Sequence, residues 1–126
     1  MNLSEYFEKT KGHGVLATAD SSGKVNAAIY ARPYFFDEDT VGFVMAERLT
    51  HANLQTNPHA AYLFIQLGQG YEGKRLHLTK VREESDDALI DTICRRCDYS
   101  LLKGQIMRHV VVFSIDRVLP LIGPGP

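Results

Sequence analysis

The sequence predicts a mainly β protein in which six short strands form an antiparallel barrel. Six apolar runs are separated by turn residues, and the segments compatible with helices are short. No βαβ unit, which takes about 30 residues, repeats along the chain. The 126 residues, of which 44% are hydrophobic, are enough to bury one core. We therefore expect a single domain over residues 1–126.

A short amphipathic helix is expected first, over residues 3–11. Leu3, Tyr6 and Phe7 have the spacing of one helical face, and Asn2 can cap the helix start. A second helix is expected over residues 86–97, capped by Ser85 or Asp86, because apolar residues recur there every three to four positions.

The expected strands alternate with turns rich in Gly, Ser, Asp and Asn. Their sequences are GVLATAD (14–20), VNAAIYARPYFF (25–36), VGFVMA (41–46), AAYLFIQ (60–66), KRLHLTKV (74–81) and QIMRHVVVFSIDRV (105–118). The tail LPLIGPGP (119–126) contains three prolines. Since proline cannot donate to a strand ladder, we expect an extended arm there rather than a central strand.

Charge and composition exclude several classes of protein. The chain has 14 basic and 15 acidic side chains, which are interspersed, so no strong field would attract nucleic acid or an anionic membrane. The first residues are too charged for a signal peptide, and no segment is long enough to span a bilayer. Two cysteines are too few for a secreted disulfide scaffold. We therefore expect a cytoplasmic protein.

The segment ERLTHANLQTNPHA, residues 47–60, carries more polar side chains than a connection between two strands needs. Thr50 can cap a helix that ends before Pro58. The start of a short helix offers free N–H groups and a positive dipole end, which bind phosphate or carboxylate. Arg48, Thr50 and Asn53 could complete an anion site. Alternatively, these residues serve only as a cap and a solvated surface.

The strand before this segment offers a place for a ring. Alternation puts Tyr30, Arg32 and Tyr34 on one face, and Pro33 interrupts the ladder, which marks an edge or a bulge. Such a site leaves backbone groups free for a ligand. A planar heterocycle with a phosphate tail would fit between this strand and the next, with Met45 as a soft apolar wall.

The order of these segments resembles the FMN-binding split barrels related to pyridoxamine 5′-phosphate oxidase, and the likeness covers residues 10–83. In that family a phosphate-binding turn leads into a short helix that ends in Asn-Leu-x-x-Asn-Pro, which is 53–58 here; the turn is 47–50. The usual basic residue falls at or next to 49–50 here, so Arg48 or His51 would replace it. The resemblance implies that the following residues bind the cofactor: Tyr30, Ala31, Arg32, Pro33, Met45, Ala46, Glu47, Arg48, Leu49, Thr50 and Asn53.

The resemblance also implies a function and an assembly. FMN would supply the redox chemistry of an oxidoreductase or an electron carrier, with a small molecule or a protein as redox partner. Arg32 could stabilise negative charge on the reduced ring, or it could pair with the acidic turn at 37–40. Vitamin B6 oxidation is not expected, because the basic C-terminal region of the true oxidases is replaced by LIGPGP. A homodimer with the flavin at the subunit interface is expected, and the arm VLPLIG could cross to the neighbour.

Other interpretations concern the cysteines and histidines. Cys94 and Cys97 close a helix, where the dipole opposes a thiolate, and they continue its apolar stripe, so packing is favoured over redox or metal chemistry. A haem-binding split barrel would need an axial ligand such as His13, His77 or His109. A third possibility is an interaction module that binds no ligand.

Overall fold

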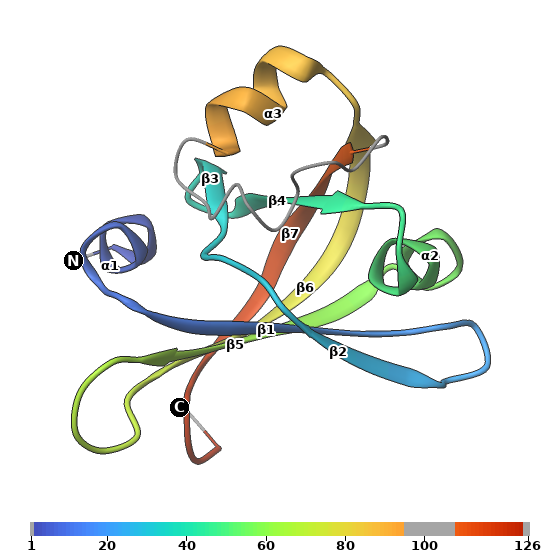
Figure 1. The fold of residues 1–126 in the computed structure, drawn as a ribbon. Helices are drawn as coiled ribbons and strands as arrows, with labels where there is room; N and C mark the ends of the chain where they lie inside the picture. Colours follow the sequence, from blue (N-terminus) through green and yellow to red (C-terminus); the bar gives the residue numbers. More distant parts are fainter. Residues whose placement is uncertain (1, 95–107, 125–126) are drawn as a thin grey trace.

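The computed structural model describes residues 2–94 and 108–124, which form one coiled antiparallel sheet with three short helices (Figure 1). The strands are β1 (Gly12–Ala19), β2 (Val25–Ile29), β3 (Tyr34–Asp37), β4 (Thr40–Ala46), β5 (His59–Gln66), β6 (Gly73–Glu84) and β7 (Arg108–Pro120). Their order in the sheet is β2-β1-β5-β6-β7-β4-β3. The prediction of a mainly β antiparallel barrel is confirmed.

The expected six strands become seven because the run over residues 25–36 is divided. β2 pairs with β1, whereas β3 pairs with β4 at the opposite edge of the sheet. Residues 30–33 connect the two strands and belong to neither. Pro33, which has no N–H to donate, stands immediately before β3. The chain therefore passes from one edge strand of the sheet to the other at the point where the ladder was expected to be interrupted.

The N-terminal helix α1 (Leu3–Lys9) begins where the sequence indicates. The Asn2 side chain accepts a hydrogen bond of 2.8 Å from the backbone N–H of Glu5. Phe7 is buried, and its ring lies 5.0 Å from that of Phe64 and 6.2 Å from that of Tyr62. α1 therefore packs against the core of the barrel through aromatic contacts.

The helix α2 (Leu49–Thr56) differs from the prediction at its start. Arg48, not Thr50, is the N-cap residue, and it makes no side-chain capping bond. Thr50 lies inside the first turn and is buried. The helix ends at Thr56, before Pro58, as expected. In the third helix, α3 (Asp87–Cys94), the Asp86 side chain accepts from the N–H of Ala88 at 2.9 Å and is the cap.

The C-terminal strand extends further than expected. β7 continues through Pro120, so the predicted arm begins only after that residue. At this end β7 pairs with β6 alone, with Pro120 opposite Lys74, because β4 pairs with β7 only up to Ser114. Proline is tolerated where one edge of the strand is free. The expected packing of Cys94 and Cys97 concerns side chains outside those that the structure describes.

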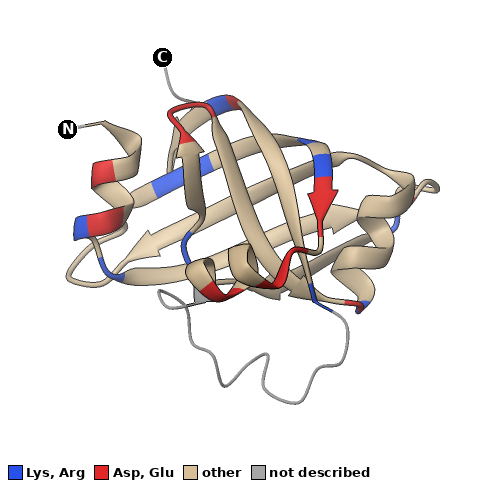
Figure 2. Ribbon diagram, turned by 90° about the horizontal axis from the view of Figure 1, so that it is seen from above, with Lys and Arg blue, Asp and Glu red and all other residues tan. Residues whose placement is uncertain are grey.

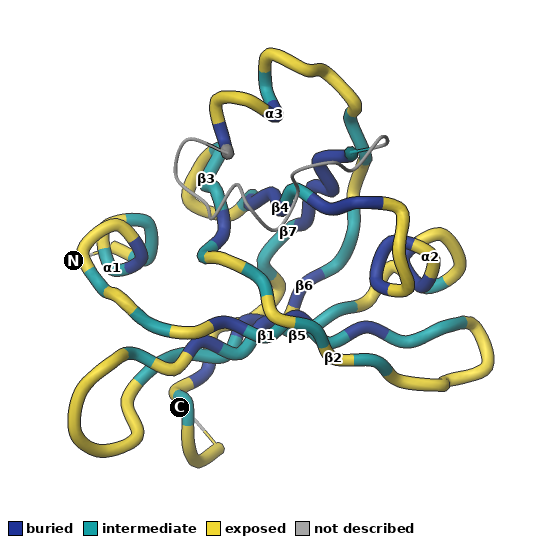
Figure 3. Tube along the Cα trace, in the orientation of Figure 1, coloured by how far each residue is buried: buried dark blue, intermediate teal, exposed yellow. Residues whose placement is uncertain are grey.

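Buried side chains form a core inside the coiled sheet. In Figure 3 the buried residues appear as dark blue segments along β1, β4, β5 and β7. Among its fully buried members are Leu16, Met45, Tyr62, Leu76 and Phe113. Basic and acidic residues are interspersed along the ribbon (Figure 2). Of the described helices, none is both long and apolar enough to cross a membrane.

Candidate cofactor-binding site

A cavity of about 550 Å³ lies between β2 and β4, beside the start of α2. This volume is within the range of sites for small molecules and cofactors. β2 contributes alternate side chains, the 30–32 connection closes one side, and β4 provides the apolar wall. The described residues that line the cavity are Asn26, Ala28, Ile29, Tyr30, Ala31, Arg32, Gly42, Phe43, Val44, Met45, Ala46, Arg48, Leu49, Thr50 and Ile93.

Polar groups gather where the cavity meets α2. The amide of Asn26 lies 3.5 Å from the Thr50 hydroxyl, which it can reach as a donor. Burial raises the pKa of Tyr30, while a hydrogen bond to Thr50 and the positive charge of Arg48 act in the opposite direction. Arg48 is exposed at the N-cap, beside the first N–H groups of the helix. These donors and this charge make the α2 end of the cavity suited to an anion.

The connection at residues 30–32 is held in place from two sides. The Tyr62 hydroxyl, on β5, lies 3.2 Å from the carbonyl oxygen of Tyr30 and 3.0 Å from that of Ala31. Arg32 donates from Nη1 to the carbonyl oxygens of Phe7 and Glu8, at 3.1 and 3.3 Å. The guanidinium thus binds the end of α1, and it is not the partner of the acidic turn that the sequence offered as an alternative.

Eight of the eleven residues predicted to bind a cofactor line this one cavity, and Pro33, Glu47 and Asn53 do not. Asn53 donates from its amide to the Thr18 hydroxyl at 3.1 Å and is buried against β1. Glu47 accepts from Nε2 of His109 at 2.8 Å. Tyr34, expected on the same face as Tyr30, packs its ring against Phe36 instead.

The sequence reasoning missed several lining residues. Asn26 and Ala28 could have been found, because they alternate with Tyr30, which follows β2, along one face of the chain, whereas Ile29 breaks this alternation. Gly42, Phe43 and Val44 belong to a run that reads simply as core. Ile93 comes from α3, and no local pattern connects that helix to β2 and β4.

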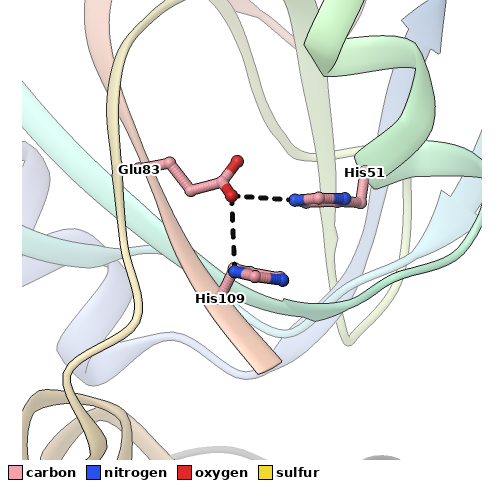
Figure 4. A group of neighbouring side chains, drawn as sticks. All are labelled: His51, Glu83 and His109. Carbon is pink, nitrogen blue, oxygen red and sulfur yellow. Dashed lines mark hydrogen bonds and ion pairs between the residues drawn. The ribbon is translucent and has the colours of Figure 1, made fainter. Parts of the chain in front are cut away.

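A second polar cluster joins α2 to β6 and β7. His51 of α2 and His109 of β7 stack their rings, with centroids 4.4 Å apart and planes 13° apart. Glu83 of β6 faces both rings (Figure 4). Burial acts to raise the pKa of Glu83, but hydrogen bonds from His51, Gln55 and Lys80 and the charge of His51 lower it to about 2.

The histidines considered as haem ligands do not reach the cavity. His13 and His77 are exposed on strands β1 and β6. His109 is buried in the second cluster. Among the described residues that line the 550 Å³ cavity, none is a histidine.

Comparisons with known proteins place the fold. No protein-family model and no curated protein matches the sequence. Solved structures do match. An FMN-binding protein from Syntrophomonas wolfei subsp. wolfei superposes with a TM-score of 0.80 at 19% identity, over 96% of this chain and 84% of that one.

Two further structures are similar. An F420 reductase superposes with a TM-score of 0.69 at 20% identity, over 94% of this chain and 97% of that one. A candidate pyridoxamine 5′-phosphate oxidase from Lactobacillus delbrueckii gives 0.66 at 14% identity, over 92% and 88%. The chain therefore has the split-barrel fold of these proteins, as the sequence resemblance implied.

Proposed function

We propose that this split-barrel chain binds FMN in the cavity between β2 and β4. The observation that carries the proposal is an apolar cavity of about 550 Å³ with Arg48, Thr50 and Asn26 at one end. A flavin has this shape and polarity, since it joins a planar ring to a phosphate. The name of the S. wolfei protein, an FMN-binding protein of the same fold, supports the choice of FMN.

Each part of the lining has a role in this proposal. Arg48, the Thr50 hydroxyl and the first N–H groups of α2 would hold the phosphate. Ile29 and Val44, which line the cavity and keep accessible surface, would contact the ring system, whereas Phe43 and Met45 are buried in the core behind them. Arg32, fixed on the end of α1, would place a positive charge along the cavity.

The proposed activity is that of an FMN-dependent oxidoreductase or electron carrier. FMN supplies hydride or electron transfer when bound. The titratable side chains among the described lining residues are Tyr30, Arg32 and Arg48. An arginine does not serve as a base at neutral pH, and burial raises the pKa of Tyr30. These residues therefore bind, orient and exclude water, and a redox partner of the flavin would complete the reaction.

A homodimer is part of the proposal. β2 is an edge strand of the sheet, and its outward side chains Val25 and Ile29 are 79% and 66% exposed. Exposed apolar residues on a free edge are a liability for a lone monomer. Ile29 also lines the cavity, so a second copy that covered β2 would bring the cofactor to the subunit interface.

The dimer is tested by light scattering during size-exclusion chromatography. We expect a mass of twice 14.1 kDa for the wild type and a monomer for Val25→Lys. Leu67→Lys is the matched control, because Leu67 is 57% exposed and lies just beyond β5, away from β2 and from the C-terminal arm. A monomeric wild type would refute this part of the proposal and leave FMN binding to be judged alone.

FMN binding is tested first by the absorption spectrum of the purified protein and then by titration with FMN and riboflavin. The two ligands differ by the phosphate, so the wild type is expected to prefer FMN. In Arg48→Ala/Thr50→Val that preference should fall tenfold or more, since charge-assisted hydrogen bonds contribute about 1.5–3 kcal/mol each. Arg82→Ala, on the exposed part of β6, should retain it.

Three outcomes would contradict the proposal. Equal affinity for FMN and riboflavin would remove the phosphate site from Arg48 and Thr50. A Soret band would favour haem. A colourless protein that takes up no FMN would leave a fold without this cofactor, and titration with F420 would then test the cofactor named by the reductase neighbour.

A further inference from the structure

The cluster behind α2 brings two imidazole nitrogens to a single carboxylate oxygen. Nε2 of His51 lies 3.0 Å, and Nδ1 of His109 lies 3.3 Å, from the same Oε2 of Glu83 (Figure 4). The three donor atoms come from α2, β6 and β7 and lie within 4.8 Å of one another. The side chains are 11%, 24% and 8% exposed for His51, Glu83 and His109. None of the three lines the cofactor cavity.

The tautomer of the neutral His109 ring follows from the contact of its Nε2 atom with Glu47. Its Nε2 lies 2.8 Å from Oε1 of Glu47, and a carboxylate oxygen only accepts, so Nε2 carries the proton. In the neutral ring Nδ1 then presents its lone pair to Ser85 Oγ, at 2.9 Å, and to Glu83. A carboxylate that orients a histidine in this way is the usual outer partner of a metal ligand.

Nδ1 of His109 and Oε2 of Glu83 are then two acceptors 3.3 Å apart, and a positive group between them would stabilise both. A second proton would make His109 a cation, stacked face to face on His51 at 4.4 Å. A metal ion would instead accept the lone pairs of both rings and of Glu83 at once. With neutral histidines, the negative charges of Glu47 and Glu83 are opposed by Lys80, whose Nζ lies 3.3 Å from Oε1 of Glu83. Lys80 occupies the oxygen that the histidines do not face.

We propose that His51, Glu83 and His109 form a binding site for a divalent transition-metal ion, with Zn²⁺ as its representative. Two imidazoles and one carboxylate are a donor set that zinc and its neighbours bind, with an open fourth position. Small side-chain rotations would bring the donor atoms to the usual distances of about 2.0–2.2 Å. The ion would connect α2 directly to β6 and β7. This site does not depend on FMN binding.

The experiment uses the full chain with Cys94→Ser and Cys97→Ser, because thiolates also bind zinc. After treatment with EDTA, calorimetric titration with zinc sulfate should give one ion per chain. His51→Gln and Glu83→Gln should each weaken binding by about 100-fold or more, and Glu47→Gln by about tenfold, as expected for an outer partner. Lys80→Met should tighten binding, because it frees the Glu83 charge. His59→Gln and His77→Gln are the controls, since both residues are exposed.

A spectroscopic measurement on the unsubstituted histidines guards against variants that fail to fold. In ¹⁵N-edited spectra, zinc should shift the ring nitrogens of His51 and His109 and leave those of His13, His59 and His77 unchanged. Circular dichroism of each metal-free variant checks its fold. The proposal is overturned if no stoichiometric zinc binding is found, if the Glu83 and His51 variants bind as the controls do, or if the shifts fall on the exposed histidines.

Discussion

The Tyr62 hydroxyl joins the interior of the barrel to the wall of the cavity, and its removal is the most informative single change. Tyr62→Phe deletes one O–H that is shared between the carbonyl oxygens of Tyr30 and Ala31, at 3.2 and 3.0 Å. The ring itself stays packed against Phe43, with centroids 5.0 Å apart. Because a single hydrogen serves both acceptors, we count one neutral hydrogen bond plus the cost of two poorly satisfied carbonyls.

The expected loss in the free energy of unfolding is about 1–2 kcal/mol, from a net bond of about 0.5–1.5 kcal/mol and a fraction of the desolvation cost. Unfolding entropy is about 2.1 cal/mol/K per residue. For 126 residues this gives about 0.26 kcal/mol/K. The melting temperature should therefore fall by about 4–8 °C. FMN affinity should fall as well, since the two carbonyls position the cavity wall.

Scanning calorimetry and FMN titration measure the two effects in parallel. Tyr71→Phe is the matched control, because Tyr71 is 77% exposed and its hydroxyl lies outside the core. If Tyr62→Phe melts within a degree of the control, the shared hydrogen bond contributes nothing and the reasoning is refuted. A lower melting temperature with unchanged FMN affinity would mean that the bond supports the barrel but not the cavity.

Three further changes test other contacts of the described residues. Asn53→Ala removes the buried 3.1 Å bond to Thr18, and we expect the free energy of unfolding to fall by about 1–3 kcal/mol, with FMN affinity nearly unchanged because Asn53 does not line the cavity. Gly14→Ala would place a Cβ 1.9 Å from the Tyr62 hydroxyl oxygen and 2.7 Å from the Tyr30 carbonyl oxygen, so little folded protein is expected. In metal-free protein, Glu83 has a folded-state pKa of about 2 against an ordinary value of 4.5, so its contribution to stability is present above pH 4.5 and lost as pH falls towards 2.

Each of these three predictions would be contradicted by a definite result. A large drop in FMN affinity for Asn53→Ala would place Asn53 in the cofactor site after all. Soluble, cooperative unfolding of Gly14→Ala at wild-type temperature would show that Tyr62 can move away. For the acid prediction, the difference in unfolding free energy between wild type and Glu83→Gln is followed by urea titration. It should shrink as the pH is lowered, and a constant difference would contradict the depressed pKa.

Much of the fold follows from local signals. The period of two in the strands, the Asn2 cap of α1 and the stop at Pro58 are each determined by neighbouring residues, and each was predicted. Pro33 indicated a break, but a break in one strand and a crossing to the other edge of the sheet look alike in sequence. The choice between them depends on the pairing of Tyr34 with Gly42, which is a long-range property.

The lining residues of the candidate site were predictable where they are continuous in sequence. The 30–32 connection and the start of α2 are each continuous in sequence, so their lining residues could be named. Thr50 was misplaced as a cap because Ser and Thr are favoured there, whereas in the structure Thr50 is the second residue of α2 and its hydroxyl lies 3.5 Å from the Asn26 amide. The cluster of His51, Glu83 and His109 joins three separate elements, and no spacing in the sequence predicts it.

The place of β7 in the sheet has a consequence for folding. This strand pairs with β6 on one side and β4 on the other. Among the described strands it is therefore the one whose hydrogen bonds link the β2-β1-β5-β6 half of the sheet to the β4-β3 half. It follows all the other described strands in the sequence, so until it pairs, β4 has only β3 beside it in the sheet. Such long-range pairing is slow, on the order of milliseconds to seconds. A chain without residues 108–120 would hold two half-sheets and lack the strand that pairs with both, so the docking of β7 is the step at which this barrel closes.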